Sequence, residues 1–280
     1  MEIKTAINKA KHLLRVNNIK SPGLDSELLM SKVLKKNRNY ILLNSNKNLK
    51  KKNLNNFTNL IKDRSRGKPI AYLMEKKEFW DYEFKIKEGV LIPRPDTEII
   101  VEQVLNITQN KSKLRILDIG TGSGCIILSI LKERKNYKGV GIDISKKCIE
   151  MCKINTFKLN LINRVKFFKS DVDNFEDAKY DLIISNPPYI NQFDLKCLEK
   201  DVYNFEPKSS LDGGIDGLSE IRKVINKSSE LIKINGKLVL EIAFDQKFRV
   251  KKLLKDRGFY INKVLKDLAN NDRCIVSTKI

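Results

Sequence analysis

The tetrapeptide Asn186-Pro187-Pro188-Tyr189 has the residue types needed to hold a flat amino group. Two successive prolines fix the backbone and remove two N–H donors, but their carbonyl oxygens stay available as acceptors. The side chain of Asn186 adds a further acceptor, Oδ1. Tyr189 adds an aromatic face that can pack on a flat substrate or near a positive charge. Together these groups can bind both hydrogens of a planar NH2 group.

The chemistry that fits such a site is transfer of a group to a weakly nucleophilic nitrogen. The lone pair of an amide nitrogen is delocalised into its carbonyl group, and acceptors on its N–H groups return electron density to the nitrogen. Alignment with an electrophile makes the displacement effectively unimolecular, an effect worth up to ~7–11 kcal/mol in ideal cases. The exocyclic amine of adenine would fit the same acceptors. A Pro-Pro turn that ends a strand is the structural alternative.

A glycine-rich segment lies upstream at 118–124, with the sequence Asp-Ile-Gly-Thr-Gly-Ser-Gly. Glycine lets a backbone turn tightly and approach a ligand, and the start of the next helix offers free N–H groups. Asp143 follows about twenty residues later, where an acid binds ribose hydroxyls, and Asp171 ends a third strand. The spacing is neither that of a dinucleotide loop nor that of a phosphate loop. It therefore favours S-adenosylmethionine, which carries a ribose but no phosphate.

Alternating strands and helices must position these two segments. Apolar strands between helices predict a parallel sheet covered on both faces. Ser145 is expected to cap one of the helices. The fold class is therefore predicted as α/β, a Rossmann-like class I S-adenosylmethionine-dependent methyltransferase sheet. Strands are expected at 114–119, 139–142, 165–168, 181–185, 238–242 and 274–278, and helices at 125–131, from 145, at 218–232 and at 246–254.

The part of the chain before this sheet has a different pattern. Apolar residues at three- and four-residue steps, beginning with Ile3, Ile7, Ala10 and Leu14, predict a small helical bundle over 1–75. Residues 76–98 are expected to form a β-hairpin and linker, in which an alternating strand at 80–86 pairs with 90–92. Thr97 is the expected N-cap of a helix through residue 107. The methyltransferase domain is predicted over 99–280.

Composition excludes several other kinds of site. Five cysteines without a Cys-x-x-Cys pair, and a single histidine, His12, argue against a disulfide framework, a metal site and a Ser-His-Asp hydrolase. No membrane span or secretory signal is apparent, so a cytoplasmic protein is expected. The 55 basic and 34 acidic residues give a net charge of +21. This excess indicates either an acidic or nucleic-acid partner, or a general drift towards lysine.

The chain resembles the HemK/PrmC family, the glutamine methyltransferases of peptide chain release factors. The resemblance covers nearly the whole chain. Five positions depart from the family pattern: Glu75, Asp81, Ala243 and Asn270 stand where glycine is usual, and Val172 where an aromatic residue is common. The matching segments are 66–72, 78–80, 91–98, 118–124, 143–145, 185–190, 205–207, 212–218, 240–242, 267–269 and 271–273.

The resemblance implies transfer of a methyl group from S-adenosylmethionine to the glutamine N5 of the release-factor Gly-Gly-Gln motif, a step connected to translation termination. It implies that the helical domain helps to bind the release factor. The residues expected to hold the amide are Asn186, Pro187, Pro188 and Tyr189. The residues expected to bind the cofactor are Gly120, Thr121, Gly122, Ser123, Gly124, Asp143, Asp171, Val172 and Asn186.

Two other functions remain open at this point. One is an adenine-N6 methyltransferase acting on nucleic acid, which the tetrapeptide and the charge permit. The other is a non-catalytic module that binds nucleic acid or ribosomes through its basic helices, against which the intact glycine-rich segment argues. The expected partner is a release factor as protein substrate, with ribosome or nucleic-acid proximity through the basic surface. We expect a monomer without membrane contact.

Overall fold

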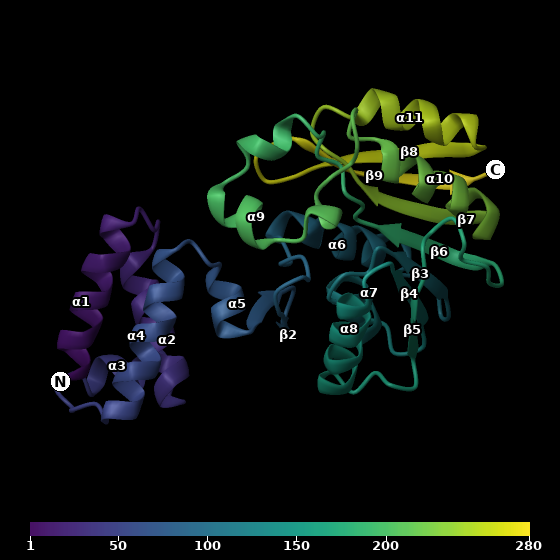
Figure 1. Ribbon diagram of the computed structural model, residues 1–280. Helices are drawn as coiled ribbons and strands as arrows, with labels where there is room; N and C mark the ends of the chain where they lie inside the picture. The colour runs from purple at the N-terminus through teal and green to yellow at the C-terminus, as the bar shows by residue number, and fades with distance from the viewer. The chain divides into compact units, whose positions relative to one another are not determined.

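The computed structural model describes residues 1–280 and divides into two compact units (Figure 1). The helical unit consists of Met1–Lys76 together with Glu199–Phe205. The sheet unit consists of Lys77–Leu198 together with Glu206–Ile280. None of the helices has both the length and the apolar character needed to cross a membrane.

The helical unit has its own apolar core. In its first helix, the buried residues are Ile3, Ala6, Ala10 and Leu14, which recur at three- and four-residue steps on one face. The expected stripe is thus correct except that Ala6, and not Ile7, completes it. The helices are α1 (Ile3–Val16), α2 (Pro22–Leu34), α3 (Arg38–Leu43), α4 (Lys51–Ser65), α5 (Ile70–Met74) and α9 (Lys200–Phe205).

The sheet unit contains a seven-stranded sheet with the order β5-β4-β3-β6-β7-β9-β8. The first five of these strands run parallel, but β9 is antiparallel to both β7 and β8. The strands are β3 (Arg115–Ile119), β4 (Lys138–Asp143), β5 (Val165–Lys169), β6 (Tyr180–Ser185), β7 (Ile232–Glu241), β8 (Phe259–Lys266) and β9 (Asp272–Lys279).

The expectation of a wholly parallel sheet is therefore wrong at one edge, and the sequence analysis missed β8. Only Phe259 is fully buried in β8, because this strand lies at the sheet edge. Its polar and apolar residues do not form the apolar run that identified the central strands. A short turn, and not a helix, joins β8 to β9, so the two strands pair as a hairpin.

Helices cover both faces of the sheet. Figure 1 shows α6, α7 and α8 on one face and α10 and α11 on the other. Ser145 caps α8 as expected, since its side chain accepts a hydrogen bond from the backbone N–H of Cys148. This arrangement confirms the expected α/β fold class. The helices are α6 (Glu98–Ile107), α7 (Cys125–Glu133), α8 (Lys146–Lys158), α10 (Ser219–Leu231) and α11 (Lys247–Asp256).

A two-stranded hairpin precedes the sheet, but its pairing differs from the expectation. Its strands are β1 (Lys76–Phe79) and β2 (Tyr82–Lys85), and residues 90–92 form no strand. The expected strand at 80–86 is interrupted because Trp80 adopts a left-handed conformation, with φ of 53°, at the turn. Buried Asn155 of α8 holds β2 in place: it accepts from the Lys85 N–H and donates to the carbonyl oxygens of Lys85 and Ser123.

Candidate active site

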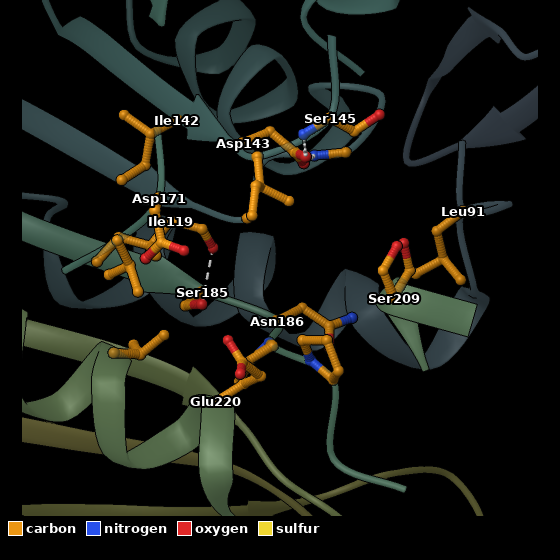
Figure 2. A pocket seen from close by; sticks show the side chains of 18 of the residues that line it. Leu91, Ile119, Ile142, Asp143, Ser145, Asp171, Ser185, Asn186, Ser209 and Glu220 are labelled. Carbon is orange, nitrogen blue, oxygen red and sulfur yellow. Dashed lines mark hydrogen bonds between the residues drawn. The ribbon is translucent and has the colours of Figure 1, made fainter. Parts of the chain in front are cut away.

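A pocket of about 860 Å³, including its open mouth, lies at the carboxyl ends of β3, β4 and β6 (Figure 2). Ligands of open parallel sheets bind at such an edge, where the polar residues that follow neighbouring strands come together. The structure brings both predicted segments to this pocket. The predicted residues on its wall are Gly120, Gly122, Asp143, Asp171, Val172, Asn186, Pro187 and Pro188.

The first two glycines of the glycine-rich segment present bare backbone to open space. Gly120 and Gly122 have φ of 74° and 58°, which L side chains rarely adopt, and a Cβ at either position would meet nothing within 4 Å. This open cradle fits the close approach of a ligand. Gly124 differs, because a Cβ there would come within 3.0 Å of Leu128 and 3.3 Å of the Cys152 sulfur. Its role is to let α7 and α8 pack closely.

Asp143 fixes the shape of the cradle. Its Oδ2 accepts from the backbone N–H of Gly122 at 2.9 Å, and its Oδ1 accepts from that of Ser145 at 2.8 Å. Burial raises the pKa of Asp143, while these two backbone donors lower it. Figure 2 shows its side chain at the pocket wall beside Ser145. A carboxylate has further lone pairs after these two bonds, so Asp143 can also accept from the hydroxyl groups of a ribose.

Thr121, Ser123 and Gly124 do not line the pocket. The hydroxyl of Thr121 donates to Oδ2 of buried Asp118 at 2.7 Å, which turns this side chain away from the pocket. Burial raises the pKa of Asp118 to about 7, against the lowering effect of the Thr121 hydrogen bond. The Thr121 side chain therefore stabilises this segment through Asp118 and does not face the ligand.

Asn186 follows directly after β6 and lies in the pocket wall (Figure 2). Its Nδ2 donates to the hydroxyl oxygen of Thr97 at 3.0 Å, which leaves Oδ1 as an acceptor. The neighbouring Ser185 hydroxyl donates to the carbonyl oxygen of Ile119 at 2.7 Å and so ties β6 to β3. The helix predicted after Thr97 is present, and Thr97 occupies its N-cap position. Its side chain makes no capping hydrogen bond, however, and contacts Asn186 instead.

Tyr189 does not line the pocket described above. It packs half-buried against the core of the sheet unit, and its hydroxyl donates to Oε1 of Glu241 at 3.2 Å. The aromatic face expected to meet the substrate is therefore anchored from its hydroxyl end. Burial raises the pKa of the Tyr189 phenol, and the nearby Glu241 charge raises it further. Tyr189 is thus neutral, and its single hydroxyl hydrogen is directed at Glu241.

Glu241 is a buried acid that the sequence analysis did not place in the site. It ends β7 and is only 2% exposed. Burial raises its pKa to about 7, while the charge of Arg273 and the hydrogen bond from the Tyr189 hydroxyl lower it. Its Oε2 has no hydrogen-bond partner. The sequence Leu240-Glu241-Ile242 could have identified Glu241, because it places a charged residue at the end of an apolar strand.

Gln246, which precedes α11, joins the last residue of the tetrapeptide to the loop at 212–217. Its Nε2 donates to the carbonyl oxygens of Tyr189 at 3.0 Å and Gly217 at 2.9 Å. The neighbouring N–H of Gly213 donates to the carbonyl oxygen of Ile190 at 2.8 Å. The glycine-containing loop at 212–217 therefore supports the tetrapeptide from the side.

Several pocket residues come from distant parts of the chain. Leu91 precedes α6, Ser209 follows Glu206, and Glu220 lies on α10 (Figure 2). Oε1 of buried Glu206 accepts from Arg94 at 2.5 Å, and its Oε2 accepts from the Ile92 N–H at 3.2 Å. This pairing connects the linker before α6 to the segment that carries Ser209. Sequence spacing gave no signal that these segments meet.

Two family models match the chain. Residues 5–74 match the PrmC N-terminal domain, and residues 110–275 match a methyltransferase domain. Among solved structures, a ribosomal protein L11 methylase from Lactobacillus delbrueckii subsp. bulgaricus is 16% identical with a TM-score of 0.50, over 72% of this chain and 89% of that one. This likeness concerns the fold alone.

Curated relatives match over nearly the whole length. The release factor glutamine methyltransferase of Fusobacterium nucleatum is 38% identical over 97% of this chain and 77% of the relative. The protein of the same name from Clostridium acetobutylicum is 37% identical over 100% of this chain and 99% of the relative. The α/β fold, the pocket and these matches agree, and the chain belongs to the family of release factor glutamine methyltransferases.

Proposed function

We propose that the protein methylates the side-chain amide nitrogen, N5, of the glutamine in the Gly-Gly-Gln motif of peptide chain release factors. The observation that carries this proposal is the position of Asn186. Its side chain lies in the wall of the same pocket as the open cradle of Gly120 and Gly122. A cofactor on the cradle and an amide at the tetrapeptide would therefore meet in one cavity.

The cofactor is S-adenosylmethionine, which supplies an electrophilic methyl group on its sulfonium sulfur and leaves as S-adenosylhomocysteine. Gly120 and Gly122 give it bare backbone, and Asp143 gives an acceptor for ribose hydroxyls. Asp171 and Val172 lie on the same wall and are assigned to the adenosine part. The residues assigned to the cofactor thus come from the carboxyl ends of three neighbouring strands.

The tetrapeptide holds the substrate amide. Oδ1 of Asn186 and the carbonyl oxygen of Pro187 accept from its two N–H groups, which raises electron density on nitrogen and points the lone pair at the methyl group. The nitrogen gains the methyl group and loses one proton to solvent. No nucleophilic side chain takes part, which agrees with buried cysteines whose thiol pKa values burial raises.

The helical unit is assigned to release-factor binding. Residues 1–75 contain 17 Lys and Arg but only five Asp and Glu, so this quarter of the chain carries more than half of the net charge of +21. Such a surface attracts an acidic partner. The concentration of charge argues against uniform drift as its sole cause.

The test is to incubate a release factor with the protein and S-adenosylmethionine and to locate the modification by mass spectrometry. We expect one added methyl group on the loop glutamine. A release factor with Gly-Gly-Ala in place of Gly-Gly-Gln should take up none. Uptake by that variant, or methylation of DNA or RNA in place of the protein, would contradict the proposal.

A further inference from the structure

The side chain of Gln246 holds the carbonyl oxygen of Tyr189, the last residue of the tetrapeptide. Nε2 of Gln246 donates to this oxygen at 3.0 Å and to the carbonyl oxygen of Gly217 at 2.9 Å. Its Oε1 accepts from the backbone N–H of Ala243 at 3.1 Å. Gln246 is only 2% exposed, so bulk water does not compete for these bonds. One buried amide therefore joins the backbone of three separate segments.

These backbone partners fix the orientation of the Gln246 amide. A carbonyl oxygen only accepts and a backbone N–H only donates, so the NH2 end must face Tyr189 and Gly217. The space around this junction is also filled. A Cβ at Gly217 would lie 2.6 Å from the Tyr189 carbonyl oxygen and 2.8 Å from Nε2 of Gln246. Hydrogen bonding and packing together therefore determine where the Tyr189 carbonyl group lies.

The tetrapeptide is attached to the sheet unit at both of its ends. At its start, Ser185 is the last residue of β6 and pairs with Ile119 and Leu240 on the neighbouring strands. At its end, Gln246 joins Tyr189 to the segment between β7 and α11. The two prolines between these points have fixed φ angles. A stiff segment that is held at both ends can direct its carbonyl oxygens over only a narrow range.

The loop at 212–217 is bonded to the residue that follows the tetrapeptide. The N–H of Ile190 donates to the carbonyl oxygen of Leu211 at 3.1 Å, and the carbonyl oxygen of Ile190 accepts from Gly213 at 2.8 Å. Gln246 joins both of these segments to Ala243, because it donates to each of them. Loss of the Gln246 amide would therefore loosen the loop and the end of the tetrapeptide together.

We propose that Gln246 is a positioning residue for methyl transfer, which fixes the tetrapeptide so that Asn186 Oδ1 and the Pro187 carbonyl oxygen meet the substrate amide. Gln246 does not line the pocket, so it acts through Tyr189 and not on the substrate itself. The inference rests on the proposed function, because only a substrate NH2 group requires two acceptors at a set spacing. Without Gln246 the amide nitrogen would be misaligned with the methyl group, although every residue that touches the substrate remained.

The first test compares the same substitution at two buried glutamines of the sheet unit. Gln246→Met has a similar volume but removes both donors, and Gln103→Met on α6 is the control outside the pocket. We expect Gln246→Met to lower the single-turnover rate about tenfold to a hundredfold at saturating substrates, the size expected when buried acceptors lose their donor. Gln103→Met should stay within about twofold of the wild type.

Cofactor binding separates positioning from general damage to the pocket. Asp143 holds the cradle through its own hydrogen bonds to Gly122 and Ser145, which Gln246 does not share. The Kd of S-adenosylmethionine, measured by calorimetry, should therefore change less than about threefold in Gln246→Met. A residue that only supported the fold would weaken cofactor binding and the rate together.

Gly217→Ala reaches the same junction from the other side, because its methyl group would displace the Tyr189 carbonyl oxygen. We expect this variant to be slow as well. The double variant Gln246→Met/Gly217→Ala should be no slower than the slower single variant, because both changes break one junction. If Gln246→Met does not fold, the rate and cofactor binding of Gly217→Ala decide the matter.

The inference is overturned if folded Gln246→Met transfers methyl at the wild-type rate, or if its rate and its cofactor binding fall equally. Effects that multiply in the double variant would also contradict it, since they would reveal two separate defects. A wild-type protein that leaves the release-factor glutamine unmodified contradicts the proposed function instead. The two failures are therefore distinguishable within one series of assays.

Discussion

Asp118 and Glu241 carry buried carboxyl groups near the carboxyl ends of β3 and β7. Burial raises the pKa of each to about 7, although the Thr121 hydroxyl donates to Asp118 and the Tyr189 hydroxyl donates to Glu241. Oδ1 of Asp118 and Oε2 of Glu241 have no hydrogen-bond partner. In the unfolded chain the pKa values of these groups would lie near their ordinary values of 3.8 and 4.5. The folded state therefore binds their protons more tightly than the unfolded state does.

The sign of the resulting pH dependence follows from this difference. A raised pKa in the folded state gives a stabilising contribution that is present below the unfolded pKa and lost as pH rises through about 7. We expect Asp118→Asn to flatten the fall in unfolding free energy between about pH 5 and about pH 8, measured by urea denaturation. An unchanged difference between the two pH values would show that Asp118 is not protonated preferentially in the folded protein.

Residue types predicted much of the pocket wall. Asn186, Asp143 and the paired glycines were identified because their spacing is itself a chemical pattern. Thr97 and Glu241 were not identified as part of the site, because their contacts with Asn186 and Tyr189 cross long stretches of chain that spacing does not encode. The assignment of individual residues to cofactor and substrate stays a prediction.

At the scale of elements, the central strands were predictable because β3, β4 and β6 are short apolar runs buried on both faces. The edge strand β8 and the first hairpin strand, β1, were not, because only one residue in each strand is buried and neither forms a buried apolar run. The position of the hairpin turn was also not predicted, because the left-handed conformation of Trp80 places the turn inside the expected strand. The sequence therefore predicted the elements that form the pocket better than the elements at the periphery.

The cradle and the start of α7 give a matched pair of glycine substitutions. Gly122→Ala places a methyl group in open space at the pocket, whereas Gly124→Ala places one against Leu128 and Cys152. Both positions have positive φ, which costs an alanine about 1–2 kcal/mol. We expect Gly122→Ala to weaken cofactor binding more, and Gly124→Ala to lower the unfolding free energy more. Calorimetry and urea denaturation measure the two effects, and the reverse order would contradict the assignment.

At the scale of the whole molecule, charge is distributed unevenly along the chain. The helical unit has many more basic than acidic residues. Each of the two units also has its own apolar core. The count over residues 1–75 argues against a general drift towards lysine as the sole source of the net charge. The uneven charge supports a role in binding an acidic partner.

Charge reversal tests this role in the full-length protein. Lys51 and Lys52 are exposed at the start of α4, where glutamate also suits the helix dipole. We expect Lys51→Glu/Lys52→Glu to raise the KM for the release factor, and to raise it less as salt is added. Lys252→Glu/Lys255→Glu on α11, also at exposed positions, is the control. Equal effects of the two pairs would mean that net charge, and not the helical unit, matters.

The most direct test of the account is the single-turnover rate of methyl transfer by Asn186→Ala with a release factor as substrate. We predict a fall of about 10²–10³ at saturating S-adenosylmethionine, typical for removal of one preorganised polar contact at a reacting centre. Methyl transfer at the wild-type rate would contradict the claim that Asn186 holds the reacting amide.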